Sequence, residues 1–291
     1  MWMSEPASFG APLPPAACPP RLSQAAAPLT RAVEVVNEFG QRRTLHIPAE
    51  RSLTLYLDKH ELVTLMTLGA HPEWLVLGYL RNQRLLSSPA QVESITVDWD
   101  VGAAAVRTQG GVSDWQTRTA QRIVTTGCGQ GSVFGAVMEA VEQIQLDPSA
   151  RLRQSQLYAI LRKVRELDSV YKQAGSVHGC ALFRGEELLL FVEDVGRHNA
   201  VDTIAGWSWL QAEEVLRGDD KVFYTTGRLT SEMILKAAQM GVPIVVSRSG
   251  ITQMGLEVAE RLGLCAIGRA THTRFLCYTH PQRLVWDTPL P

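Results

Sequence analysis

The chain has 291 residues, of which 45% are hydrophobic and 20% are charged, and its formal net charge is -1. This composition is ordinary for a soluble globular protein, and the length allows two modest domains. A nearly neutral chain has no global basic field for nucleic acid or for an anionic membrane, so we expect neither as a partner. Five cysteines without a C-x-x-C pair argue against a disulfide framework and for a reducing, cytoplasmic location.

The first 30 residues are rich in proline and alanine and have almost no periodic pattern, so we expect 1–30 to be a disordered tail. Strands, one helix and further strands then predict a small α+β domain over residues 31–120. Its expected elements are two strands of a hairpin (32–36 and 43–47), a strand at 52–57, a helix at 72–86, and strands at 92–99 and 103–108.

A glycine-rich loop follows, in the stretch Arg122-Ile-Val-Thr-Thr-Gly-Cys-Gly-Gln-Gly-Ser-Val-Phe-Gly135. A β-branched run leads into Gly127, Gly129 and Gly131, and a helix is expected over 132–145. Cys128 therefore lies where a strand would turn into a helix, a position that lowers a thiol pKa and favours the thiolate. The alternative is a small residue in a tight turn.

Residues 121–291 alternate between β and α patterns, which predicts a layered α/β domain. Ser149 is expected to cap one long helix over 149–173. The other expected elements are strands at 181–183 and 188–192, a helix at 199–216, a strand at 222–226, a helix at 231–240, a strand at 243–247, a helix at 253–262, and strands at 264–267 and 275–278.

Two successive strand–loop–helix units carry an arginine where each helix begins. Gly227 and Arg228 precede the first helix, with Thr230 as its expected N-cap, and Arg248 precedes the second. Helix-end amides beside an arginine suit phosphate or pyrophosphate. The alternative is two ordinary loops with solvated arginines.

The segment Glu193-Asp-Val-Gly-Arg-His-Asn199 places many polar side chains directly after an apolar strand. Arg197 and His198 are candidates for contact with phosphate or with a thiolate, and Asp194 would orient one of them. Equally, the segment is a capped strand-to-helix turn in which Asp194 or Asn199 is the cap.

Two other classes of site have weak support. Zinc-dependent nucleoside deaminases carry H-x-E followed by P-C-x-x-C, whereas this chain has His178-Gly-Cys180 and no C-x-x-C, so we expect no metal. The glycine spacing at 127–135 also departs from G-x-G-x-x-G, and no acidic ribose partner is evident.

Four motifs together resemble the formate dehydrogenase accessory sulfurtransferase family (FdhD/NarQ). The resemblance covers roughly residues 31–286, with the motifs in the same order. They are Thr125-Thr-Gly-Cys-Gly129, Val192-Glu-Asp-Val-Gly-Arg-His-Asn-Ala-Val-Asp202, Thr226-Gly-Arg-Leu-Thr-Ser-Glu-Met-Ile-Leu-Lys236 and Tyr278-Thr-His-Pro-Gln-Arg283.

The resemblance implies a sulfur carrier that acts as a sulfurtransferase. Such proteins take sulfur from a cysteine desulfurase as a persulfide and pass it to the molybdenum or tungsten bis-pyranopterin guanine dinucleotide cofactor, which formate dehydrogenase needs for activity. No permanently bound cofactor is implied. The implied fold is a small α+β domain before a cytidine-deaminase-like α/β domain without catalytic zinc, and the implied assembly is a homodimer.

By the same resemblance, Cys128 matches the persulfide-forming cysteine, and residues 269–274 match the stretch that contacts the cofactor. The family's C-G-x-C-G loop has lost its second cysteine here, because that position is Gly131. One thiolate is enough for a persulfide, and Cys180 is the candidate substitute for the missing thiol. The residues of the cofactor stretch are Arg269, Ala270, Thr271, His272, Thr273 and Arg274.

Two rival functions follow from the same features. The missing second cysteine favours a non-catalytic chaperone that would bind the cofactor and formate dehydrogenase without carrying sulfur. A pyridine-nucleotide reductase that uses the glycine loop would instead bind NAD(P).

Overall fold

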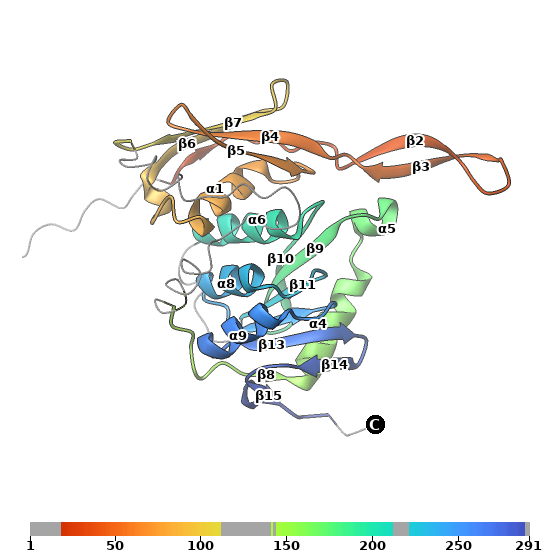
Figure 1. Ribbon diagram of the computed structural model, residues 1–291, viewed down its shortest axis with the longest axis vertical. Coiled ribbons are helices and arrows are strands. Elements are labelled where there is room, and N and C mark those ends of the chain that lie inside the picture. Colours follow the sequence, from red (N-terminus) through yellow and green to blue (C-terminus); the bar gives the residue numbers. More distant parts are fainter. Residues whose placement is uncertain (1–18, 112–140, 142–143, 212–220, 289–291) are drawn as a thin grey trace, which may run out of the picture.

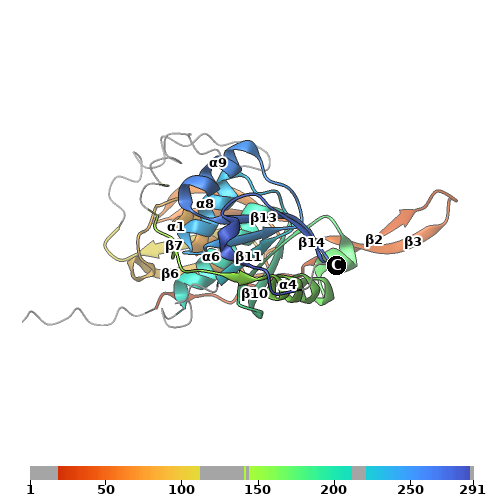
Figure 2. The ribbon, with the colours of Figure 1, turned by 90° about the horizontal axis from the view of Figure 1, so that it is seen from below.

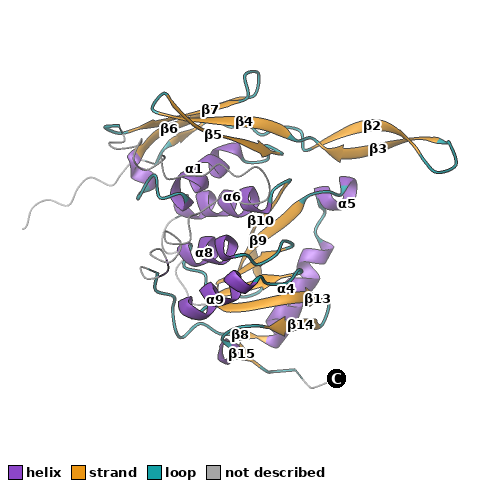
Figure 3. Cartoon of the chain, viewed as in Figure 1, coloured by secondary structure: helices purple, strands orange, loops and turns teal. Residues whose placement is uncertain are grey.

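The computed structural model describes residues 19–111, 141, 144–211 and 221–288. Two sheets lie on opposite sides of a pair of helices that pack against each other (Figures 1 and 3). The α/β class predicted from the sequence is thereby confirmed, whereas a specifically cytidine-deaminase-like layering stays a prediction. The glycine loop with Cys128 and Gly131, and nearly all of the helix predicted after it, lie outside the described residues.

The amino-terminal sheet has five strands in the order β1-β6-β7-β4-β5. Its apolar face packs on helix α1 (Pro72–Asn82), and this contact forms a core of leucine, valine and isoleucine side chains. The helix begins at Pro72, whose missing N–H costs nothing at a first turn. The strands are β1 (Arg21–Leu22), β4 (Arg51–Leu57), β5 (His60–Thr67), β6 (Val92–Asp98) and β7 (Ala103–Thr108).

Two features of this sheet differ from expectation. Arg21 and Leu22 pair in parallel with Ser94 and Ile95, so this part of the predicted tail is an edge strand. The Ser23 hydroxyl fixes the connection by donating to Glu73 Oε1 at 2.6 Å. Strand β5, which has no counterpart among the expected elements, pairs antiparallel with β4. Residues 1–18 lie outside the described residues.

Strands β2 (Thr30–Val36) and β3 (Arg42–Pro48) form the predicted hairpin, a two-stranded ribbon that extends away from both sheets (Figure 1). One face carries the ion pair Arg42–Glu34 at 3.3 Å, together with Thr44 and His46. The other face carries aliphatic side chains, and Leu45 is 51% exposed there. The alternation of polar and apolar residues follows the two-residue period of a strand.

The second sheet has six strands in the order β10-β9-β11-β12-β13-β14. The central strands β11, β12 and β13 are parallel, and the outer pairs are antiparallel. The strands are β9 (His178–Arg184), β10 (Glu187–Asp194), β11 (Lys221–Thr225), β12 (Ile244–Ser247), β13 (Cys265–Thr271) and β14 (Arg274–Cys277).

Helices cover both faces of this sheet, and successive side chains along each strand enter different cores. Phe223 packs with helices α6 (Arg197–Leu210), α8 (Ser231–Gln239) and α9 (Gln253–Leu262). Its neighbours Val222 and Tyr224 pack with helix α4 (Gln154–Glu166) on the other face. Figure 2 shows α8 and α9 on one side of the sheet and α4 on the other. Strands buried on both faces explain the continuous apolar runs in the sequence.

The single helix predicted over 149–173 is wrong. Helix α4 begins after Arg153, and a second, short helix α5 (Val170–Ala174) follows an interruption. Ser149 is not the cap of α4, whose N-cap position is Arg153, and the Ser149 hydroxyl donates to Asp147 Oδ1 at 2.6 Å. Ser169 starts α5 by accepting from Lys172 N. The two short strands β8 (Leu152–Arg153) and β15 (Leu284–Val285) pair beside α4.

Helix α1 covers the five-stranded sheet and helix α6 covers the six-stranded sheet, and the two sheets with their helices form two units. The helices α1 and α6 pack against each other through glycines and so join these units. A Cβ atom on Gly78 would lie 1.7 Å from Asp202 O, and one on Gly206 would lie 1.9 Å from Trp74 O. Both contacts are with backbone atoms, which cannot rotate out of the way. The two helices therefore cross at a distance that only glycine permits at these positions.

Gly206→Ala is expected to destabilise the protein by about 3 kcal/mol, because the methyl group would force the helices apart. Alanine's better helix propensity would offset only about 1 kcal/mol of this. Urea unfolding measures the loss. Gly250→Ala is the control, since a Cβ there meets nothing within 4 Å. Equal stability of the two variants would contradict the close crossing.

Candidate functional site

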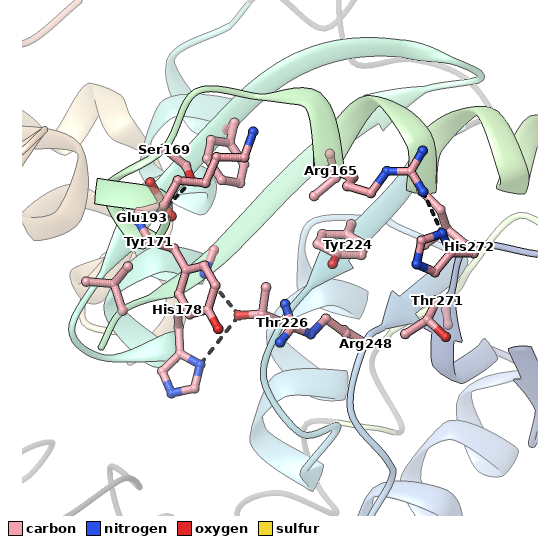
Figure 4. A pocket seen from close by; sticks show the side chains of 17 residues that line it. Arg165, Ser169, Tyr171, His178, Glu193, Tyr224, Thr226, Arg248, Thr271 and His272 are labelled. Carbon is pink, nitrogen blue, oxygen red and sulfur yellow. Dashed lines mark hydrogen bonds between the residues drawn. The ribbon is translucent and has the colours of Figure 1, made fainter. Parts of the chain in front are cut away.

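A cavity of about 600 Å³ opens at the edge of the six-stranded sheet where the parallel strands end. Thr226 and Arg248 directly follow β11 and β12, and Thr271 ends β13. Parallel strands place their carboxyl ends at one edge, which is where open α/β sheets bind ligands. The cavity is lined by Leu161, Val164, Arg165, Ser169, Tyr171, Lys172, Val177, His178, Gly179, Phe191, Glu193, Tyr224, Thr226, Arg248, Ala270, Thr271 and His272 (Figure 4).

Four of the predicted site residues meet in this cavity: Arg248, Ala270, Thr271 and His272. The last three lie where β13 turns into β14. His272 has a φ of 54°, in the left-handed region, and its Nδ1 lies 2.5 Å from Arg165 Nη1 (Figure 4). The turn therefore brings the predicted cofactor stretch against helix α4.

The rest of the predicted stretch is on the same turn but does not line the cavity. Arg269, Thr273 and Arg274 are exposed to solvent. Arg269 has a φ of 50°, and its backbone N–H donates to Ser249 O at 2.7 Å, which ties the stretch to the loop after β12. Each of these arginines is within two residues of a lining residue along the chain.

The loop after β11 places its predicted residues differently. Arg228 is exposed outside the cavity lining, and Gly227 is buried. A Cβ on Gly227 would lie 2.7 Å from Arg197 Cδ, so glycine lets the arginine pack beneath the loop. Thr230 is the residue before α8, as predicted, but its side chain makes no capping hydrogen bond.

Arg197 and His198 are buried under the cavity rather than exposed to it. His198 Nε2 lies 3.0 Å from Glu232 Oε2 on α8. Burial lowers the pKa of His198, and the Glu232 carboxylate opposes that shift. Neither residue lines the cavity, so direct contact with a bound anion is not supported for them.

Asp194 acts as the cap of a strand-to-helix turn and as a link between the two units. Its Oδ1 accepts from Gly196 N and Asn199 Nδ2, and its Oδ2 accepts from Leu68 N and from the Thr67 hydroxyl. These four donors use the acceptor capacity of the carboxylate. These contacts support the alternative in which residues 193–199 form a capped strand-to-helix turn.

Comparison with known proteins now gives the affiliation. A family model described as the FdhD/NarQ family matches residues 48–285. The chain belongs to the FdhD/NarQ family. Relatives named sulfur carrier protein FdhD include one from Bacillus subtilis, 33% identical over 81% of this chain and 88% of that protein. Another, from Bacillus pumilus, is 29% identical over 88% of this chain and 98% of that protein.

A crystal structure of a candidate formate dehydrogenase accessory protein from Desulfotalea psychrophila is similar in fold, with a TM-score of 0.70. The sequences are 26% identical, and the match covers 89% of this chain and 100% of the other. Among the described residues, every helix falls short of the length or apolar character that spanning a bilayer requires. That part of the chain also has no three His, Cys, Asp or Glu side chains placed to hold a metal ion.

Cys180 is a poor substitute for the second loop cysteine of the family. Its side chain is fully buried in the core under α6, and its Sγ lies 3.3 Å from Thr225 Oγ1. Burial raises the pKa of the Cys180 thiol to about 12. A thiol held protonated at neutral pH is not a nucleophile.

The cavity of this FdhD/NarQ protein has an excess of positive charge. Arg165, Lys172 and Arg248 line it, and Glu193 is the acidic residue among the lining side chains. The Glu193 carboxylate accepts from Val170 N at 2.6 Å and Tyr171 N at 3.2 Å, so it is used in starting α5. The cations therefore remain available to an anionic ligand.

Sequence reasoning missed the contribution of α4 and α5 to the cavity. Arg165 and Tyr171 lie within the span predicted as one helix, where they resemble ordinary surface positions. The ring of Tyr171 lies 5.6 Å from Arg248 Cζ, a cation–π contact across the cavity. The break at residues 167–169 turns Tyr171 toward the sheet, and the Asp168-Ser169 pair was its only signal in the sequence.

His178 lies at the cavity floor, where its Nδ1 is 3.5 Å from Thr226 Oγ1. Its pKa is lowered, first by burial and then by the charges of Arg197, His198 and Arg228. The imidazole is therefore neutral at pH 7, so it adds no charge of its own to the cavity.

The lowered pKa of His178 predicts a loss of stability in acid. Between its unfolded pKa of 6.5 and its lower folded pKa, the unfolded state binds a proton that the folded state resists. Stability due to this group is thus full above pH 6.5 and is lost as pH falls through the folded pKa. Urea unfolding at about pH 7.5 and about pH 5.5 should show a smaller loss for His178→Gln than for the wild type.

The matched control for this pH dependence is His46→Gln, because His46 is on the exposed hairpin. This variant is expected to keep the wild-type loss of stability. If His178→Gln behaves as His46→Gln does, then burial of His178 is not a source of the acid sensitivity.

Proposed function

We propose that this protein is a sulfur carrier for formate dehydrogenase maturation, with the molybdenum or tungsten bis-pyranopterin guanine dinucleotide as its acceptor substrate. The observation that carries the proposal is the cationic cavity at the carboxyl edge of the parallel strands, in a chain whose family relatives are named sulfur carrier protein FdhD. The turn with Ala270, Thr271 and His272, which matches the family's cofactor stretch, forms one wall of that cavity.

The first half of the proposed reaction is an exchange at Cys128. Its thiolate attacks the outer sulfur of a cysteine desulfurase persulfide, the S–S bond of that persulfide breaks, and the desulfurase thiolate leaves. No net oxidation occurs, and Cys128 gains one sulfur as a persulfide. Glycine at positions 127, 129 and 131 would suit a loop that must face first the donor and then the acceptor.

The second half needs the acceptor held close to that loop. A cavity of this size accommodates one nucleotide-sized group, so we place one guanosine diphosphate portion of the acceptor inside it. Arg248 and Arg165 would bind its phosphates, and the Tyr171 ring would pack on the base. Arg269 and Arg274 on the β13–β14 turn would contact what extends beyond. The cytoplasmic location and the homodimer belong to this proposal as well.

Arg248→Ala is expected to weaken the binding of guanosine diphosphate by roughly tenfold to a hundredfold, since a charged hydrogen bond contributes about 1.5–3 kcal/mol. Calorimetric titration measures the dissociation constant. Arg107→Ala is the matched control, because that side chain is 71% exposed on β7 of the other sheet. Equal weakening by both variants, or by neither, would place the nucleotide elsewhere.

Labelled cysteine tests the carrier step directly. After incubation with a cysteine desulfurase and ³⁵S-cysteine, the label should appear on Cys128 and should be removed by a thiol reductant. Cys128→Ala is expected to lose the label, whereas Cys180→Ala should keep it because that thiol is buried and protonated. Equal labelling of Cys128→Ala and the wild type would disprove the role of Cys128.

A second candidate function is a chaperone that binds the cofactor without carrying sulfur. Gly131 in place of a second loop cysteine, together with the burial of Cys180, favours it. The two functions differ in a complementation assay with a strain that lacks this protein. Maturation of formate dehydrogenase by Cys128→Ser would support the chaperone, and its loss in a folded variant would support the carrier.

A further inference from the structure

Two cysteines outside the cavity lie in contact on neighbouring strands. Cys265 begins β13, Cys277 ends β14, and their Sγ atoms are 3.8 Å apart. Cys265 is completely buried, and Cys277 is partly exposed. Both side chains belong to the core on the α4 face of the sheet. Neither is used by the proposed sulfur transfer.

The sheet register fixes this contact. Ile267 is the partner of Cys277, and Cys265 points to the same face as Ile267 because it is two residues away. Thr279 closes the ends of the two strands: its hydroxyl accepts from Ala266 N at 2.9 Å and donates to Leu264 O at 2.6 Å. Main-chain pairing therefore places the two side chains on one face as diagonal neighbours, where their Sγ atoms meet.

The environment makes the two sulfurs unequal. The hydrogen bond from Cys265 lowers the pKa of the Cys277 thiol, although burial opposes the shift. The same contact and burial raise the pKa of Cys265. Cys277 Sγ also lies 3.3 Å from the Thr279 carbonyl oxygen at the end of the hairpin. The partly exposed thiol is thus the more readily ionised of the two, and its buried neighbour keeps the proton.

We propose that Cys265 and Cys277 form a redox-modification site that closes to an intrachain disulfide under hydrogen peroxide. The Cys277 thiolate attacks one peroxide oxygen, the O–O bond breaks, and hydroxide leaves, which gives a sulfenic acid. The Cys265 sulfur then attacks the Cys277 sulfur, the S–O bond breaks, and water leaves with the Cys265 proton. Two thiols lose two electrons, and the peroxide becomes two waters.

The geometry requires a modest movement. A disulfide bond is about 2.05 Å long, so the two sulfurs must approach from their van der Waals contact. Cys265 is the diagonal neighbour of Cys277 in the ladder, a spacing of about 7–8 Å between Cα atoms, so the strand ends must shift as the side chains rotate. The product would tie the open end of the β13–β14 hairpin, whose opposite end is the turn with Thr271 and His272. Oxidation would thereby restrain the strands that carry one wall of the cavity.

The test uses the full-length protein treated with hydrogen peroxide and then with an alkylating reagent, followed by peptide mass spectrometry without reduction. We expect a linked peptide pair containing Cys265 and Cys277, reversed by dithiothreitol. Peroxide should consume Cys277 roughly tenfold or more faster than Cys180, which has a raised thiol pKa of about 12. Hydrogen exchange of the β14 amides should slow several-fold in the oxidised form.

Two variants keep the test independent of folding defects. Cys277→Ser changes the partly exposed partner and should abolish the linked peptide while it preserves the unfolding temperature, and Cys180→Ser is the control that retains it. Linked peptides that join Cys277 to Cys18 or Cys128 instead would overturn the proposal. Separate irreversible oxidation of Cys277 with no crosslink would overturn it too, and unchanged β14 exchange would disprove the restraint on the hairpin.

Discussion

The buried carboxylate of Asp194 is the constraint on which the arrangement of this protein depends. It is 3% exposed, and it binds donors from the end of β5 in one unit and from the start of α6 in the other. Burial raises the pKa of Asp194, while its hydrogen bonds favour the charged form. Loss of the carboxylate would leave three buried donors and the partly buried Gly196 amide without this acceptor, and each buried group costs about 1–3 kcal/mol.

This link also determines where the cavity lies. Asp194 ends β10, and Glu193, the preceding residue, points to the cavity side and binds the first amides of α5. Adjacent residues on a strand face opposite ways, so one motif joins the units on one face and shapes the cavity on the other. A second buried ion pair, between Lys236 on α8 and Asp202 on α6 at 2.8 Å, holds α8 against α6.

Much of the fold was predictable because its patterns are local. The hairpin, α9 and the strands at 222–226 and 243–247 depend on apolar periodicity and on turn residues, which a single sequence displays. Strand β5 was missed because its residues, from His60 to Thr67, mix polar and apolar side chains on an edge strand. The merged helix over 149–173 failed because periodicity continues across the break, where the Ser169 cap is a weak signal.

The site was predictable only in part, since its residues come from loops whose mutual placement is a tertiary property. The two strand-end arginines look equivalent in sequence, yet only Arg248 lines the cavity. Arg197 packs under Gly227, and the next residue, Arg228, faces solvent. In the sequence, the polar segment at 193–199 resembles a catalytic cluster. The sequence does not show that several of these side chains are buried and bind across the contact between the two units.

The cysteines of the described residues constrain how a carried sulfur would leave. A persulfide holds its outer sulfur at the oxidation level of elemental sulfur, so release as sulfide requires two electrons. Cys180 cannot readily supply them, because its thiol is buried and protonated. Cys265 lies six residues before Thr271 at the cavity turn, roughly 20 Å along an extended strand, and Cys277 lies beside Cys265. Under the proposed function, with glycine at position 131, the electrons would come from a second molecule or from the acceptor itself.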